Sequence, residues 1–171
     1  GIHINKPRVW ALTHGMIHTE PGDFIKDGTI IIREGKIDKV GRYIKVPLDA
    51  YEIDLEGAHV YAGFIDSWLK VKQDEKIIST NQHWNSKIRA DYKAIDDFKI
   101  KEKDLQALYS VGITAAHVVP EKGIIKGQSD LVILSKNPIS ISESVAQIIE
   151  FKASRWSDRE YPNSLLGTIA L

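Results

Sequence analysis

The sequence predicts a mixed α/β fold in two parts: an antiparallel β domain over residues 1–65 and an α/β part over residues 66–171. Short strand-like segments separated by turns fill the first third of the chain. After Asp66 the pattern changes to a long polar and charged segment. Further along, a helical pattern, a glycine and an apolar strand follow one another, which is typical of an α/β unit.

Three segments carry the predicted strands of the first part. "RVWALTHGMIHT" (8–19) is rich in residues that favour strands and stops at "EPGD", a strong turn signal. "GTIIIREGKIDKVG" (28–41) predicts a hairpin with its turn at Glu34-Gly35. "YEIDLEGAHVYAGFID" (51–66) begins with alternating apolar and acidic residues, which predicts antiparallel strands with one solvent-facing side.

The second part begins with a polar segment and continues with a helix and a strand. Residues 72–103 are charged and weakly periodic, which indicates a long surface excursion. "KEKDLQALYSVG" (101–112) predicts a short helix with Gly112 as its C-terminal stop. "ITAAHVVP" (113–120) follows as a strand of the buried type.

The last third is predicted to hold a further strand at 129–135. Residues 144–153 fit either a helix start with a capping box or a strand, and their partial alternation favours the strand. "YPNSLLGTIAL" (161–171) indicates a helix that starts at an Asn163 or Ser164 cap. Because the sequence stops shortly after this apolar helix begins, we expect a truncated domain.

Composition and charge exclude several classes of function. Lys plus Arg and Asp plus Glu both number 23, so the formal net charge is zero and nothing supports a nucleic-acid role. The apolar runs are far too short to span a membrane. The absence of cysteine excludes disulfides, thiolate zinc sites and cysteine nucleophiles.

The stretch "GTIIIREGKIDKVG…YEIDLEGAHVYAGFIDSWLKV" resembles the amidohydrolase superfamily, closest to its imidazolonepropionase-like branch. "LYSVGITAAHVVP" (108–120) is similar to a later α/β step of the same family. The resemblance implies a β-sandwich-like composite domain over residues 1–65 and a partial (β/α) barrel, an incomplete α/β barrel fragment, over residues 66–171. It also implies a metal-dependent hydrolase of C–N bonds.

The residues after Asp66 depart from the family pattern at two positions. The family carries a His-x-His pair there, and alternate strand residues point to the same side, so two imidazoles reach one metal. Trp68 and Lys70 stand at those positions in this sequence. An indole N–H is a donor only and an ammonium has no lone pair, so we expect the first half of the metal site to be lost.

Chain length also argues against a complete metal centre. A barrel takes about 250 residues, and the part after Asp66 is far shorter. The family's later ligands therefore have no counterpart.

A competing alignment matches "SDLVILSKNPIS" (129–140) to the strand by which amidohydrolases return to the sandwich. The colinear amino-terminal alignment is favoured, and the other stays open.

The remaining polar residues give weaker candidates. His14 and His18 fall in a strand-like run, which favours ordinary strand residues over ligands. His117 lies within an apolar strand, where a satisfied buried histidine is the simpler interpretation. His83 and Trp84 could contact a sugar or peptide. Catalysis by Asp96-Asp97 is not favoured, and residues 120–129 lack phosphate-loop spacing and predict a turn.

Three hypotheses follow. The first is a non-catalytic, degenerate amidohydrolase module without metal or other cofactor, which self-associates or docks on a larger amidohydrolase chain because its unfinished barrel exposes strand edges. The second is part of an active enzyme, with zinc or a similar metal, whose remaining barrel comes from other sequence; Trp68 and Lys70 would then shape the pocket. The third is a peptide- or glycan-binding module that uses Trp68, Trp84 and Trp156.

Possible ligand contacts are Trp68, Lys70, His83, Trp84 and His117. The resemblance implies a periplasmic or secreted location, with the cytoplasm as the alternative.

Overall fold

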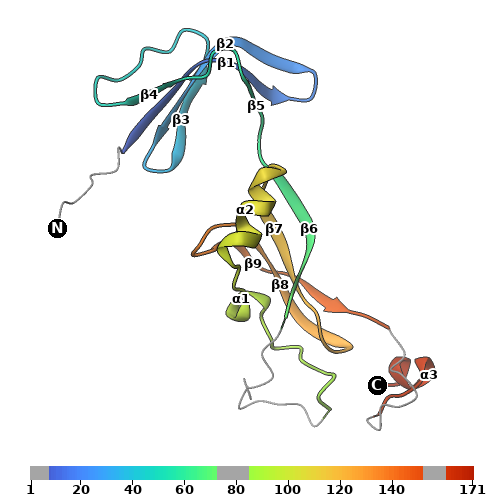
Figure 1. Ribbon diagram of the computed structural model, residues 1–171. Coiled ribbons are helices and arrows are strands. Elements are labelled where there is room, and N and C mark those ends of the chain that lie inside the picture. Colours follow the sequence, from blue (N-terminus) through green and yellow to red (C-terminus); the bar gives the residue numbers. More distant parts are fainter. Residues whose placement is uncertain (1–7, 73–84, 152–160) are drawn as a thin grey trace, which may run out of the picture. The chain divides into compact units, whose positions relative to one another are not determined.

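The computed structural model describes residues 8–72, 85–151 and 161–171 (Figure 1). The chain divides into two compact units, Gly1–Ala62 (unit 1) and Gly63–Leu171 (unit 2). No helix in the described parts of the chain has the length and apolar character that a membrane crossing requires.

Unit 1 is built on a meander of three strands, β1 (Val9–Glu20), β2 (Asp23–Arg33) and β3 (Lys36–Gly41). The predicted hairpin is confirmed. Glu34 and Gly35 form its two-residue turn, and both have positive φ, 51° and 78°, as a type I′ turn requires. The sheet order is β3-β2-β1-β4, with β5 also paired to β1.

The last two strands of unit 1 correct the sequence prediction. β4 (Tyr51–Asp54) and β5 (His59–Val60) both run parallel to β1, where antiparallel strands were expected. The reason is the segment 42–50, which carries the chain back along the sheet before β4 begins. Its apolar residues Ile44, Val46 and Ala50 pack against the small core of Val9, Ala11 and Ile31. The described residues of unit 1 thus form one sheet covered by a loop, and no second sheet of a sandwich is seen among them.

Unit 2 contains a four-stranded sheet in the order β6-β7-β8-β9. Its strands are β6 (Phe64–Val71), β7 (Ile113–Pro120), β8 (Ile125–Ile133) and β9 (Ile139–Ile149). β6 and β7 are parallel, whereas β7, β8 and β9 are antiparallel neighbours.

The described strand pairing does not show the predicted barrel fragment. A (β/α) barrel needs parallel strands joined by helices, and here short turns join β7 to β8 and β8 to β9. Only the β6-to-β7 step has helices in its connection. The described residues therefore show one βαβ step on a mixed sheet, which is too little to define a barrel.

Two helices, α1 (Ala94–Asp97) and α2 (Glu102–Ser110), lie in the β6-to-β7 connection and pack on one face of the sheet (Figure 1). The helix prediction for 101–112 is confirmed, and Gly112 (φ 81°) follows its end. The buried core beneath the helices consists of Val71, Ala94, Leu105, Ala116, Val118, Val132 and Leu134.

The predicted surface excursion over residues 72–103 is wrong for much of its described part. Ala94 is fully buried, and Ile95, Phe98 and Ile100 pack on the core. Charged residues lie between these apolar residues in the sequence, so the apolar periodicity was not recognised. Residues 73–84 lie outside the described part of the chain.

The strands after β7 are longer than predicted. β8 begins at Ile125, inside the segment expected to be a turn. β9 runs from Ile139 to Ile149 and confirms the strand interpretation over residues 144–149, while residues 152 and 153 lie outside the described part of the chain. The final helix, α3 (Leu165–Ile169), starts where predicted, with the Ser164 hydroxyl accepting a hydrogen bond from the Gly167 N–H at 3.0 Å.

Candidate functional site

The face of the unit 2 sheet opposite the helices, here called the open face, carries the two positions that the family resemblance marks as metal ligands. Leu69 and Val71 of β6 pack into the helix-covered core. Since side chains alternate along a strand, Trp68 and Lys70 belong to the open face, and Lys70, near the end of β6, also borders a cavity beside α2. Both are exposed, Trp68 to 52%.

His117 of β7 lies next to Trp68 on this open face. Its Nε2 lies 2.8 Å from the Ser129 hydroxyl on β8, and its Nδ1 lies 3.2 Å from the Ser67 carbonyl oxygen. The Trp68 ring meets the imidazole edge-on, with centroids 6.3 Å apart. Both ring nitrogens therefore have partners in neighbouring strands, and this fixes the ring across three strands of the sheet.

The donor set of the open face does not fit a hydrolytic metal ion. A metal needs lone pairs, and neither an indole N–H nor an ammonium presents one. Both nitrogens of His117 are already engaged, one with a hydroxyl and one with a carbonyl. Within the described ranges, no group of three or more His, Cys, Asp or Glu residues is arranged to hold a metal. We therefore assign no metal-dependent step to Trp68, Lys70 or His117.

The other predicted contacts are only partly described. His83 and Trp84 fall in residues 73–84, and Trp156 falls in residues 152–160, so all three lie outside the described residues. Their convergence on Trp68 stays a prediction.

Unit 2 also has a cavity of about 930 Å³, which sequence reasoning missed. It is lined by residues 69–72 at the end of β6, residues 97–101, and Asp104, Ala107 and Leu108 of α2. The Asp97 carboxylate at its wall accepts a hydrogen bond from the Tyr92 hydroxyl at 3.0 Å. Burial of Tyr92, together with this carboxylate, raises the pKa of its phenol well above the usual value.

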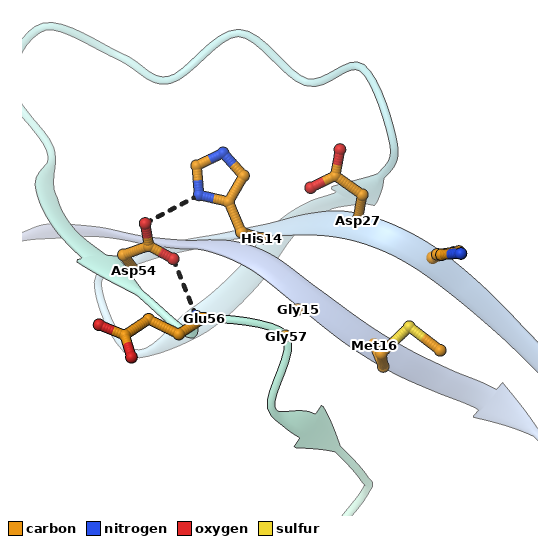
Figure 2. Close-up of a pocket in the computed structure, with 8 residues that line it drawn as sticks. His14, Gly15, Met16, Asp27, Asp54, Glu56 and Gly57 are labelled. Carbon is orange, nitrogen blue, oxygen red and sulfur yellow. Dashed lines mark hydrogen bonds and ion pairs between the residues drawn. The ribbon is translucent and has the colours of Figure 1, made fainter.

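A second pocket, of about 320 Å³, lies on unit 1 and is lined by ionisable side chains (Figure 2). The His14 Nδ1 lies 3.1 Å from an Asp54 carboxylate oxygen, and the other oxygen accepts the Glu56 N–H at 2.9 Å. That backbone hydrogen bond, assisted by His14, lowers the pKa of Asp54. Asp27, on β2, lines the same pocket.

Two residues that line the unit 1 pocket have strained backbone conformations that the sequence pattern did not indicate. His14 and Asp27 both have φ of 54°, in the left-handed region. The register of β1 against β2 shifts between Leu12 and Gly15, so His14 sits at a β-bulge. The available sequence signal was "DLEG" (54–57), in which an Asp bonds the backbone two residues on. His14 and His18, considered together as a pair, have different partners: Asp54 for His14 and His59 for His18.

Comparison with known proteins gives a fold and no family. No protein-family profile matches the chain, and no curated protein does. The structure is similar to that of an amidohydrolase from Thermotoga maritima MSB8, with a TM-score of 0.68 and 19% identity. The alignment covers 94% of this chain and 44% of that one, so this chain spans less than half of that protein.

Two further solved structures align over smaller parts. An amidohydrolase with 26% identity covers 37% of this chain and 15% of its own, with a TM-score of 0.32. A prolidase complexed with N-methylphosphonate-L-proline has 18% identity and covers 64% of this chain and 25% of its own, with a TM-score of 0.41. These superpositions are too partial to support an argument. The likeness to the Thermotoga protein shows an amidohydrolase-like fold, and the imidazolonepropionase-like branch stays a prediction.

Proposed function

We propose that this chain is a non-catalytic amidohydrolase-like module whose open sheet face packs against a second copy of the chain. The observation that carries the proposal is the half-exposed Trp68 ring, which meets His117 on the face away from the helix-covered core, with Lys70 at the next alternate position of β6. Those are the positions at which the family resemblance implies metal ligands, and neither side chain offers a lone pair.

The apolar character of the open side supports packing against another polypeptide. Trp68 and Ile133 are 52% and 43% exposed, and β9, at the sheet edge, exposes four large apolar side chains. Ile139 lies opposite Ile133 and shares its face, and the other three are Ile141, Val145 and Ile149 along the edge strand. Clustered apolar surface of this kind marks interaction sites on soluble proteins, and an unpaired edge strand can pair with another chain.

Light scattering of the purified chain tests this proposal. We expect the wild type to have a mass above that of one chain, and Trp68→Glu to shift it to a single chain because a carboxylate cannot be buried in an apolar contact. Tyr43→Glu is the matched control, since Tyr43 is an exposed aromatic residue of unit 1. A compact wild-type monomer, or equal masses for both variants, contradicts the proposal.

A second candidate is part of an active metal-dependent hydrolase whose remaining barrel comes from sequence outside this chain. The observation in its favour is that 94% of this chain aligns to only 44% of the Thermotoga protein. Hydrolysis of simple amides by a longer polypeptide containing this chain, dependent on added Zn²⁺ and altered by Lys70→Ala, would support this candidate over the first.

A further inference from the structure

Three ring side chains of unit 1 meet on the sheet surface, outside both pockets. They are His18 of β1, His59 of β5, and Tyr61, which follows β5. The His18 Nε2 lies 2.9 Å from the His59 Nδ1, and the Tyr61 hydroxyl lies 3.4 Å from the same His59 nitrogen. The His59 Nδ1 therefore has an imidazole nitrogen and a phenol oxygen close beside it.

The strand pairing explains why these residues meet. β1 and β5 are parallel, with Met16 opposite His59 and Ile17 opposite Val60. Continuing this register by one residue brings His18 beside Tyr61, and alternation puts His59 on the same face as Tyr61. The His18 and Tyr61 rings are stacked, with centroids 4.1 Å apart and an interplanar angle of 12°. The backbone thus holds all three ring side chains on one side of the sheet.

The two imidazoles face each other edge to edge. Their planes differ by 19°, and their centroids are 5.1 Å apart, so the short contact joins the two nitrogens in the plane of the rings. Such a contact requires one nitrogen to carry the hydrogen and the other to accept it. In the described part of the chain, neither ring has a carboxylate within ion-pair distance, so only the shared hydrogen links them.

We propose that His18, His59 and Tyr61 form a binding site for a late first-row divalent metal ion, with Cu²⁺ the preferred member of the class. The metal takes the place of the shared hydrogen and binds the His18 Nε2 and the His59 Nδ1; the imidazole that donated that hydrogen carries it on its other nitrogen instead, and the Tyr61 phenol releases its proton to solvent. The Tyr61 oxygen is the third ligand, and solvent completes the coordination.

The required movement is small. Cu²⁺ prefers tetragonal geometry, in which neighbouring ligands with metal–nitrogen bonds of about 2.0–2.1 Å are roughly 2.9 Å apart. The present distance between the two nitrogens is 2.9 Å, and the His59 and Tyr61 side chains are exposed. Imidazole ligands suit Cu²⁺, Ni²⁺ and Zn²⁺, and affinity for such ligands is highest for Cu²⁺.

This site differs in place and chemistry from the lost family metal centre. It lies on unit 1, it uses no residue of the open face, and it implies no hydrolysis. It is therefore independent of the proposed function, and either can fail without the other.

Titration of the full chain with Cu²⁺, followed by calorimetry and electron paramagnetic resonance, tests the inference. His3 is replaced by alanine in every sample so that it contributes no imidazole. We expect one Cu²⁺ per chain with hyperfine coupling to two nitrogens. His18→Ala and His59→Ala should each lose this binding phase, and Tyr61→Phe should keep both nitrogens and lose the phenolate charge-transfer band.

His14→Ala is the matched control, because His14 is an exposed histidine of the same unit with a different partner. It should bind as the parent does, and all variants should keep the parent's circular dichroism spectrum. Absence of binding, or equal binding by the parent and by His18→Ala and His59→Ala, overturns the site. Loss of binding in His14→Ala alone would do the same and would move the metal to the unit 1 pocket.

Discussion

The two faces of the unit 2 sheet come from the same strands yet have opposite environments. On the covered face, α1 and α2 bury a continuous apolar core, and Leu105 of α2 is only 3% exposed. On the open face, Trp68 is half-exposed and His117 is held by hydrogen bonds to strand neighbours. The apolar core therefore lies under the covered face, while the open face is the surface that we propose to pack against a second copy of the chain.

The largest expected difference between the faces is in the free energy of unfolding. Leu105→Ala should lower it by about 2–5 kcal/mol, because a buried leucine leaves a cavity in the core. Trp68→Ala on the open face should change it by about 1 kcal/mol or less in a single chain. Urea unfolding at low protein concentration, with hydrogen exchange of β7 and β8 as a second probe, measures both. Equal losses would mean that the open face is itself part of a packed core.

Neighbouring residues on opposite faces sharpen the contrast. Asp130 and Ser129 are both fully buried. The Asp130 carboxylate accepts the Ile95 N–H at 3.2 Å and the Ser144 N–H at 3.0 Å, and so ties α1 and β9 to the sheet. Asp130→Asn should cost about 1–3 kcal/mol, because an amide offers one acceptor oxygen for two buried donors.

The matched change on the other face is Ser129→Ala. The Ser129 hydroxyl contacts His117 and the Ala146 backbone. Its loss should cost about 1 kcal/mol, the value of an ordinary hydrogen bond. The same unfolding measurements apply. A larger loss for Ser129→Ala than for Asp130→Asn would contradict the assignment of stability to the covered face.

The smallest expected effect lies in unit 1 and depends on pH. The Glu56 N–H and His14 lower the pKa of Asp54 below 3.8. A depressed carboxyl pKa stabilises the fold above the unfolded value and loses this contribution as the pH falls through the folded value. Asp54→Asn keeps an acceptor for Glu56 but removes the charge, so its small deficit against wild type should shrink in acid. Unfolding curves from about pH 6 down to pH 3 test this, and a deficit that grows in acid would contradict it.

Local sequence signals predicted individual elements well. The Glu34-Gly35 turn, the helix that stops before Gly112 and the Ser164 cap are each set by residues within a few positions of one another, so the sequence shows them directly. Strand direction was harder to predict from the local sequence. β4 has the residue alternation expected of an antiparallel strand, but it pairs parallel to β1. Its direction is set by the path of residues 42–50 and not by its own residue pattern.

The sequence by itself indicated most of the strands and the helix ends, and it predicts that Trp68 and Lys70 stand where the family resemblance implies metal ligands. Only the tertiary structure decided which face of β6 these residues occupy, because that depends on where the helices pack. The same holds for His18 and His59, which meet although they are 41 residues apart. Contacts between distant segments depend on strand register, and register is set by the packing of the whole sheet.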